Sequence, residues 1–120
     1  MAVNILENFI TKKVRKGDVY VPSALLLLLK NKGKASVKQI AKLIYIFEKK
    51  HSLEKYEMIV KNMVVVILDQ YSLITIKDDT IILNTWPIKD DDVQKLIMLC
   101  YKVSNGFFRN LKTQNQQKAA

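Results

Sequence analysis

The sequence predicts a mainly α-helical domain with one small β-hairpin and additional helices at both ends. Apolar residues recur at helical spacing in several separate stretches of the chain. Two short runs rich in β-branched residues, 73–76 and 80–83, surround a polar turn, which is a hairpin signal. The 120 residues include only three glycines and two prolines, which leaves little room for long loops.

We expect a single domain, because 120 residues suffice for one hydrophobic core but are few for two. Its expected extent is residues 1–112, with a core at 19–86 and a C-terminal helix at 91–111. Residues 113–120 are polar and rich in glutamine, which predicts a disordered tail or a linker.

The first expected elements are a short amphipathic helix at 3–13 and a brief extended segment at 19–21. Pro22 favours the extended segment, because the residue before a proline is biased away from helix. A core helix is then expected at 24–30, and its leucine run predicts burial nearly all round while being far too short for a membrane span. Gly33 is expected to end this helix in a left-handed conformation.

Two further helices are expected, each with an N-cap. Ser36 and Gln39 have the spacing of a capping box, and Ile40, Leu43, Ile44 and Phe47 follow at helical spacing. Ser52 offers the N-cap of a longer third helix. The apolar stripe expected for that helix consists of Tyr56, Val60, Met63, Val64, Ile67, Leu68 and Tyr71. Its expected outer faces carry Lys55, Met58, Lys61, Asn62 and Val65.

Helix, helix and hairpin in this order, with another helix just upstream, is the layout of a winged helix-turn-helix. After the hairpin, Trp86 is expected to cover an edge of the core. Asp90–Asp92 then opens the final helix, where carboxylates complement the helix dipole. The apolar face expected for this helix comprises Val93, Leu96, Ile97, Cys100, Val103, Phe107 and Leu111, and Gly106 is expected to bend or end it.

The net charge of +9 indicates an anionic partner, with nucleic acid ahead of an acidic membrane. A composition rich in lysine and poor in arginine also follows from AT-rich coding, so the distribution of charge is more informative than its sum. Residues 12–55 contain twelve Lys or Arg and three acids, whereas residues 68–92 contain six acids and two lysines. The early helices are therefore expected to face phosphates, and the hairpin tip at Asp78–Asp79 is expected to repel them.

Double-stranded DNA is accordingly the expected partner. The residues expected to contact its phosphates or to lie at its groove are Lys12, Lys13, Arg15, Lys16, Lys30, Lys32, Lys34, Lys38, Lys42, Lys55, Lys61 and Asn62. Asn62 has the side chain that pairs with an adenine edge. The cations at 12–16 suit a helix C-terminus equally well, and Lys38 and Lys42, one turn apart, equally suit a solvated helix surface.

No motif for catalysis or cofactor binding is found: glycine-rich phosphate loops, zinc-protease motifs and nucleophile elbows are all lacking. A metal site at Asp90–Asp92 is disfavoured, because consecutive carboxylates point in different directions. His51 is expected to be a polar loop residue. Cys100, the single cysteine, is expected in the core of a protein of the reducing cytoplasm, and the N-terminus lacks the pattern of a signal peptide.

Two groups of segments form a familiar pattern. One is RKGDVYVP at 15–22, followed by the leucine-rich helix and ASVKQIA at 35–41; the other is Tyr56 with 60–63 and 66–68. Together they resemble the N-terminal winged-helix domains fused to restriction endonucleases, those of the HNH type among them.

This resemblance spans about residues 13–108. In that family a helix similar to 92–111 leads toward the nuclease domain, so the resemblance implies a DNA-recognition module whose catalytic domain would begin where this chain stops. An excised domain and a stand-alone relative both remain open. A protein-interaction or dimerisation module of a small regulator is the alternative, using Met58 and Val65, Phe107–Phe108, or a homodimer through the C-terminal helix. A small nuclease is least favoured.

Overall fold

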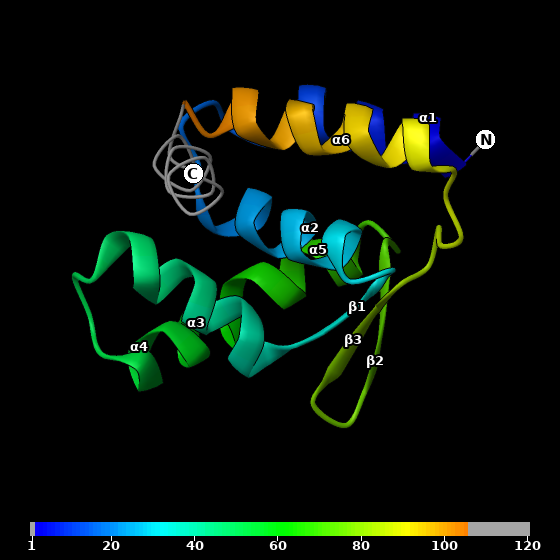
Figure 1. Cartoon of the computed structure of the whole chain (residues 1–120). Helices are drawn as coiled ribbons and strands as arrows, with labels where there is room; N and C mark the ends of the chain where they lie inside the picture. Colours follow the sequence, from blue (N-terminus) through cyan, green and yellow to red (C-terminus); the bar gives the residue numbers. More distant parts are fainter. Residues whose placement is uncertain (1, 106–120) are drawn as a thin grey trace, which may run out of the picture.

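In a computed structural model of the chain, residues 2–105 are described, with side chains from Ile5 onward. The protein is mainly helical, as the sequence predicts, and the predicted hairpin belongs to a small three-stranded antiparallel sheet. Figure 1 shows the helices in layers: α1 (Ala2–Asn8) and α6 (Asp90–Val103) lie side by side on one side of α2 (Tyr20–Lys30). The helices α3 (Val37–Glu48) and α4 (Leu53–Ile59) lie on the other side of α2.

The helix predicted at 3–13 is confirmed, but its second half, η1 (Phe9–Lys13), is a π-helix. Both halves pack against α6, and the Lys95 Nζ lies 3.3 Å from a Glu7 carboxylate oxygen at this contact. Beyond η1 the chain turns at Gly17, where φ is +92° and the amide donates to the carbonyl of Val103 at 2.7 Å. The N-terminal segment is thereby fixed to the middle of α6 and to its C-terminal end.

The helix α2 begins at Tyr20, so the extended segment predicted at 19–21 and the helix start predicted at Ala24 are wrong. Pro22 is the third residue of the helix, where no amide has an intrahelical acceptor and the missing N–H costs nothing. Asp18 supports this start, because its Oδ1 accepts from the amide of Tyr20 at 3.1 Å. The leucine run that follows is buried almost throughout, as predicted.

A strand, β1 (Lys34–Ser36), precedes α3, where no strand was predicted from the sequence. It pairs antiparallel with β3 (Thr80–Leu83), which also pairs with β2 (Ile74–Lys77), so the sheet order is β1-β3-β2. Of the three residues of β1 only Ala35 is buried. A strand this short is not recognisable from the alternation of polar and apolar residues in the sequence. The predicted hairpin is confirmed at 74–83.

The predicted capping box of α3 is present. The amide of Gln39 donates to Ser36 Oγ at 3.1 Å, and the amide of Ser36 donates to Gln39 Oε1 at 2.9 Å. Ser52 caps the third helix with its side chain alone: its Oγ accepts from the amide of Lys55 at 3.1 Å.

The third helix consists of α4, the π-helix η2 (Val60–Val64) and α5 (Val65–Gln70). Because π-helical hydrogen bonds reach one residue further, η2 shifts the buried face of the helix by about one position. Val64 and Val65 are consequently both buried, whereas Met63 is 51% exposed. The predicted stripe is wrong at Met63 and at Tyr71, which is 45% exposed, and the prediction that Val65 faces outward is also wrong.

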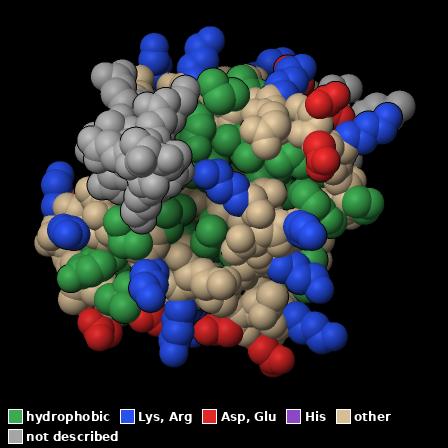
Figure 2. Space-filling model, in the orientation of Figure 1, with side chains coloured by type: hydrophobic (Ala, Val, Ile, Leu, Met, Phe, Trp, Pro, Cys, Tyr) green, Lys and Arg blue, Asp and Glu red, His purple; other side chains and the backbone are tan. Residues whose placement is uncertain are grey.

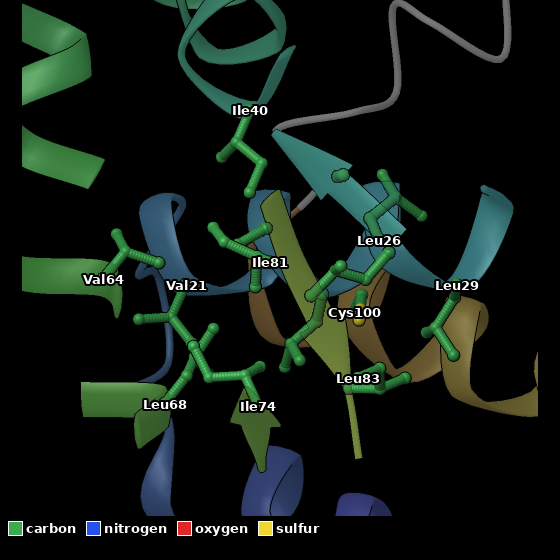
Figure 3. Packing of buried hydrophobic residues seen from close by; sticks show 14 of the residues in the cluster. Val21, Leu26, Leu29, Ile40, Val64, Leu68, Ile74, Ile81, Leu83 and Cys100 are labelled. Carbon is green, nitrogen blue, oxygen red and sulfur yellow. The ribbon is translucent and has the colours of Figure 1, made fainter. Parts of the chain in front are cut away.

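Side chains from every layer meet in one core around β3. In Figure 3 Ile40 of α3 and Leu26 of α2 lie beside Ile81, and Leu68 of the third helix lies beside Ile74 of β2. Cys100 of α6 is fully buried in the same cluster, as predicted.

The helix α2 ends at Lys30 with Asn31 as its C-cap, and Lys32, with φ of 57°, takes the left-handed position that was predicted for Gly33. Gly33 follows and also has a positive φ, +89°. A Cβ on Gly33 would lie 2.7 Å from Cγ of Trp86, so the indole packs directly on the glycine and covers this edge of the core. The final helix is described only to Val103, so the predictions for Gly106, Phe107, Leu111 and the tail at 113–120 lie outside the described residues.

Candidate nucleic-acid interface

The outer surface of α3 carries exposed cations. Lys38, Lys42 and Tyr45 are exposed and follow one another at spacings of four and three residues. Side chains at these spacings lie along one side of a helix. Lys49, which is also exposed, is the C-cap residue directly after the helix and has a left-handed φ of 55°. At 1.5 Å of rise per residue Lys38 and Lys42 lie roughly 6 Å apart along the helix axis. Two lysines arranged in this way suit neighbouring phosphates of one strand, and Lys49 adds a third cation at the end of the helix.

The only acid of α3, Glu48, is held by two tyrosine hydroxyls. Its Oε1 accepts hydrogen bonds from the hydroxyls of Tyr20 and Tyr56, both at 2.8 Å. The hydroxyl oxygen of Tyr56 in turn accepts from the amide of Lys50 at 3.1 Å. This network joins α2, the α3–α4 turn and α4, and so fixes the angle between α3 and the third helix.

Burial and the carboxylate of Glu48 change the acidity of both tyrosines. Tyr56 is fully buried, and its pKa is raised by desolvation first and by the hydrogen bond to Glu48 second. The pKa of Tyr20 is raised for the same reasons in the same order. The rings of Tyr20, Tyr45 and His51 surround Tyr56 in edge contacts, with centroids 5.5–6.3 Å away. His51 lies in the turn, as predicted.

The third helix and the hairpin tip form a hollow of about 380 Å³. It contains the predicted groove residues Lys61 and Asn62, but Lys55 does not line it. Three carboxylates that were not predicted to lie there, those of Glu54, Glu57 and Asp79, line it as well. This hollow therefore has more negative than positive side chains, and a phosphate strand inside it would be repelled.

The helical spacing of Glu54, Glu57 and Lys61 would have placed all three on one face of the third helix. The approach of Asp79 to that face depends on how the hairpin folds back, and no local pattern carries that information.

The other predicted site residues are distributed over the molecule. Lys12 and Lys13 line a hollow beside Tyr71, and Lys16 lines another with Lys102 of α6. Lys30 and Lys32 line a groove of about 730 Å³ between the end of α2 and α6. Arg15 and Lys34 are exposed. These hollows share no lining residues with one another or with the hollow at the third helix.

Figure 2 shows the same distribution on one face: Lys and Arg side chains occur all over it and along its rim. Asp and Glu gather along the lower edge, under α3, α4 and the hairpin, and at the upper right where α6 begins. The acidic hairpin tip predicted at Asp78–Asp79 is an exposed turn between β2 and β3.

Within residues 2–105, no three His, Cys, Asp or Glu side chains are grouped as a metal ion would require. None of the helices described is long and apolar enough to span a bilayer. No protein-family model, curated protein or solved structure matches the chain.

Proposed function

We propose that this protein is a DNA-binding domain of the winged-helix type in which α3 lies along the phosphate backbone of a duplex. The observation that carries the proposal is the pair of Lys38 and Lys42 on the exposed side of α3, followed by the exposed Lys49 at its C-cap. The carboxylate of Glu48 is held by the hydroxyls of Tyr20 and Tyr56. Lysines follow phosphates through charge alone, so this contact positions the domain without selecting a sequence.

The order of the elements supports the winged-helix assignment. The chain runs from α2 through β1 to α3, then to the third helix, and closes with the hairpin of β2 and β3. The short strand β1 joins the hairpin into one sheet and thereby places the hairpin beside the third helix. In helix-turn-helix proteins the first helix of the motif crosses the backbone, which is the role proposed for α3.

The acids in the hollow at the third helix restrict how that helix can approach DNA. Glu54 and Glu57 lie toward its N-terminal end, so the phosphates are best held by α3. Asn62 and Lys61 remain the side chains of the third helix suited to base edges. On the resemblance at 15–22 and 35–41 we further propose that the domain is the recognition part of a restriction endonuclease. A reading frame that continues into a nuclease domain would support this assignment.

Fluorescence anisotropy with a labelled duplex at 50 and 200 mM salt tests the proposal. The variant Lys38→Gln/Lys42→Gln removes two phosphate contacts and should lower affinity roughly tenfold or more at low salt, with a salt slope smaller by about two. The matched control Lys12→Gln/Lys13→Gln removes the same charge from the opposite layer and should change affinity much less.

The proposal is wrong if the unmodified protein shows no salt-dependent binding at low ionic strength. Equal losses in the two double variants would instead leave DNA binding standing and remove α3 as its site.

A protein-interaction or dimerisation module is the second candidate, and the exposure of apolar residues on the third helix favours it. Met58, Met63 and Val66 are each more than half exposed. Light scattering of the unmodified protein and of Met58→Ser would reveal a dimer formed through this helix. A homodimer through α6 is a separate possibility that the same measurement addresses with Met98→Ser, since Met98 is 56% exposed.

A further inference from the structure

A hollow of about 330 Å³ lies between the N-terminal helical segment and the start of the hairpin. Ile5 and Phe9 contribute from α1 and η1, and Tyr71 and Leu73 contribute from the chain that enters β2. Asn8, Lys12 and Lys13 complete the lining. The hollow therefore combines an apolar surface with two cations.

The apolar part of this surface is only partly covered by the fold. Ile5 is 53% exposed and Tyr71 is 45% exposed, although Phe9 beneath them is buried. The Tyr71 ring packs edge-on against Phe9 with centroids 5.2 Å apart, so the wall of the hollow is held in place rather than free to collapse. Exposed apolar side chains that meet at a concave site are typical of protein-binding surfaces.

The charged side chains that line the hollow have one sign. Among the described residues no acid lines it, whereas Lys12 and Lys13 do, and the exposed cations Arg15 and Lys16 follow them in the chain. A partner that matches this surface must therefore carry negative charge next to an apolar group.

The shape of the hollow selects among such partners. A DNA duplex offers phosphates but no protruding apolar group that would fill a concave apolar site. An anionic membrane is broad, and apolar side chains that insert into it must project from the protein rather than line a hollow. A protein segment offers both a protruding side chain and flanking carboxylates.

We propose that this hollow is a docking site for an acidic protein segment that inserts one large aliphatic or aromatic side chain between Ile5 and Tyr71 while its carboxylates pair with Lys12 and Lys13. The site lies on the α1–α6 side of α2, opposite α3, so it is independent of the proposed DNA contact (Figure 1).

Two labelled dodecapeptides test this proposal by fluorescence anisotropy. Both are rich in glutamate; one carries a central leucine and the other a serine at the same position. The leucine peptide should bind at least about tenfold more tightly, because its side chain is buried in the hollow. Lys12→Gln/Lys13→Gln should weaken both peptides several-fold, whereas Lys38→Gln/Lys42→Gln should leave the leucine preference and most of the affinity intact.

Ile5→Ser isolates the apolar contact, and Met98→Ser is its matched control on α6 with similar exposure. Ile5→Ser should remove most of the difference between the two peptides, and Met98→Ser should preserve it. Circular dichroism confirms that each variant is folded. Equal binding of the two peptides to the unmodified protein would overturn the proposal, since general charge attraction would then suffice. It would also be overturned if vesicles with phosphatidylserine bound through Lys12 and Lys13 while the leucine peptide did not bind.

Discussion

At the scale of single residues, burial makes two kinds of ionisable side chain hard to charge. Cys100 is fully buried in the apolar core, and burial raises the pKa of its thiol to about 12. Burial and the Glu48 carboxylate raise the pKa of Tyr56 as well. Above pH 9 the unfolded thiol loses its proton while the folded one keeps it, so the unfolded state binds fewer protons and stability falls as pH rises from about 9 toward 12.

We therefore expect the free energy of unfolding to fall between pH 7 and pH 10.5, with about 2 kcal/mol of that loss due to Cys100. Urea denaturation at both pH values measures the loss. Cys100→Ala should begin from a lower stability, because it leaves a cavity, but should lose about that much less on raising the pH. An unchanged pH dependence in Cys100→Ala would show that this thiol is not the group that titrates.

At the scale of elements, the sequence predicted what local chemistry determines. Three local features were predicted correctly: the capping box of Ser36 and Gln39, the N-cap Ser52, and the hairpin turn at Asp78–Asp79. Each of them depends on contacts between residues only a few positions apart. The strand β1 was missed because it is stabilised by pairing with β3, which lies more than forty residues away in the sequence. The shift at η2 was missed for a similar reason: two adjacent buried valines fit a π-helix only when the neighbouring layers are known.

Ser36→Ala tests how much the α3 cap contributes. The change removes the acceptor for the amide of Gln39 at the end of β1, where the chain turns from sheet into helix. We expect a loss of about 1 kcal/mol in the free energy of unfolding. Ser36→Thr keeps the acceptor and is the control; it should lie close to the unmodified protein in the same urea titration. An Ala variant as stable as the Thr variant would mean that water replaces the cap at no cost.

At the scale of the whole molecule, the charge is divided among surfaces rather than gathered on one. The sequence predicted a basic first half, but the N-terminal helical segment, which carries Lys12 and Lys13, lies across α2 from α3, which carries Lys38 and Lys42 (Figure 1). Segments close in sequence can lie on opposite layers, so a count along the chain does not predict a surface. The placement of Lys38 and Lys42 one turn apart on one helix was predictable, because helical periodicity alone fixes it.

The acidic hairpin tip provides a test of where a duplex would lie. If DNA follows α3, whose first residue Val37 lines the same hollow as Asp79, the tip is near enough for its charge to oppose binding. Asp78→Asn/Asp79→Asn should then raise DNA affinity several-fold at 50 mM salt and less at 200 mM, because salt screens the repulsion. Asparagine tolerates the left-handed conformation of Asp78, which has φ of 57°, so the turn should be retained.

Asp91→Asn, an exposed carboxylate in the first turn of α6 on the opposite side of α2, is the matched control. It changes net charge by one unit at a distance from α3 and should leave DNA affinity nearly unchanged. A comparable gain per charge from Asp91→Asn and from the tip variant would indicate that net charge alone drives binding. No gain from the tip variant would place the duplex away from the hairpin, since a fixed carboxylate beside a phosphate strand must weaken the complex.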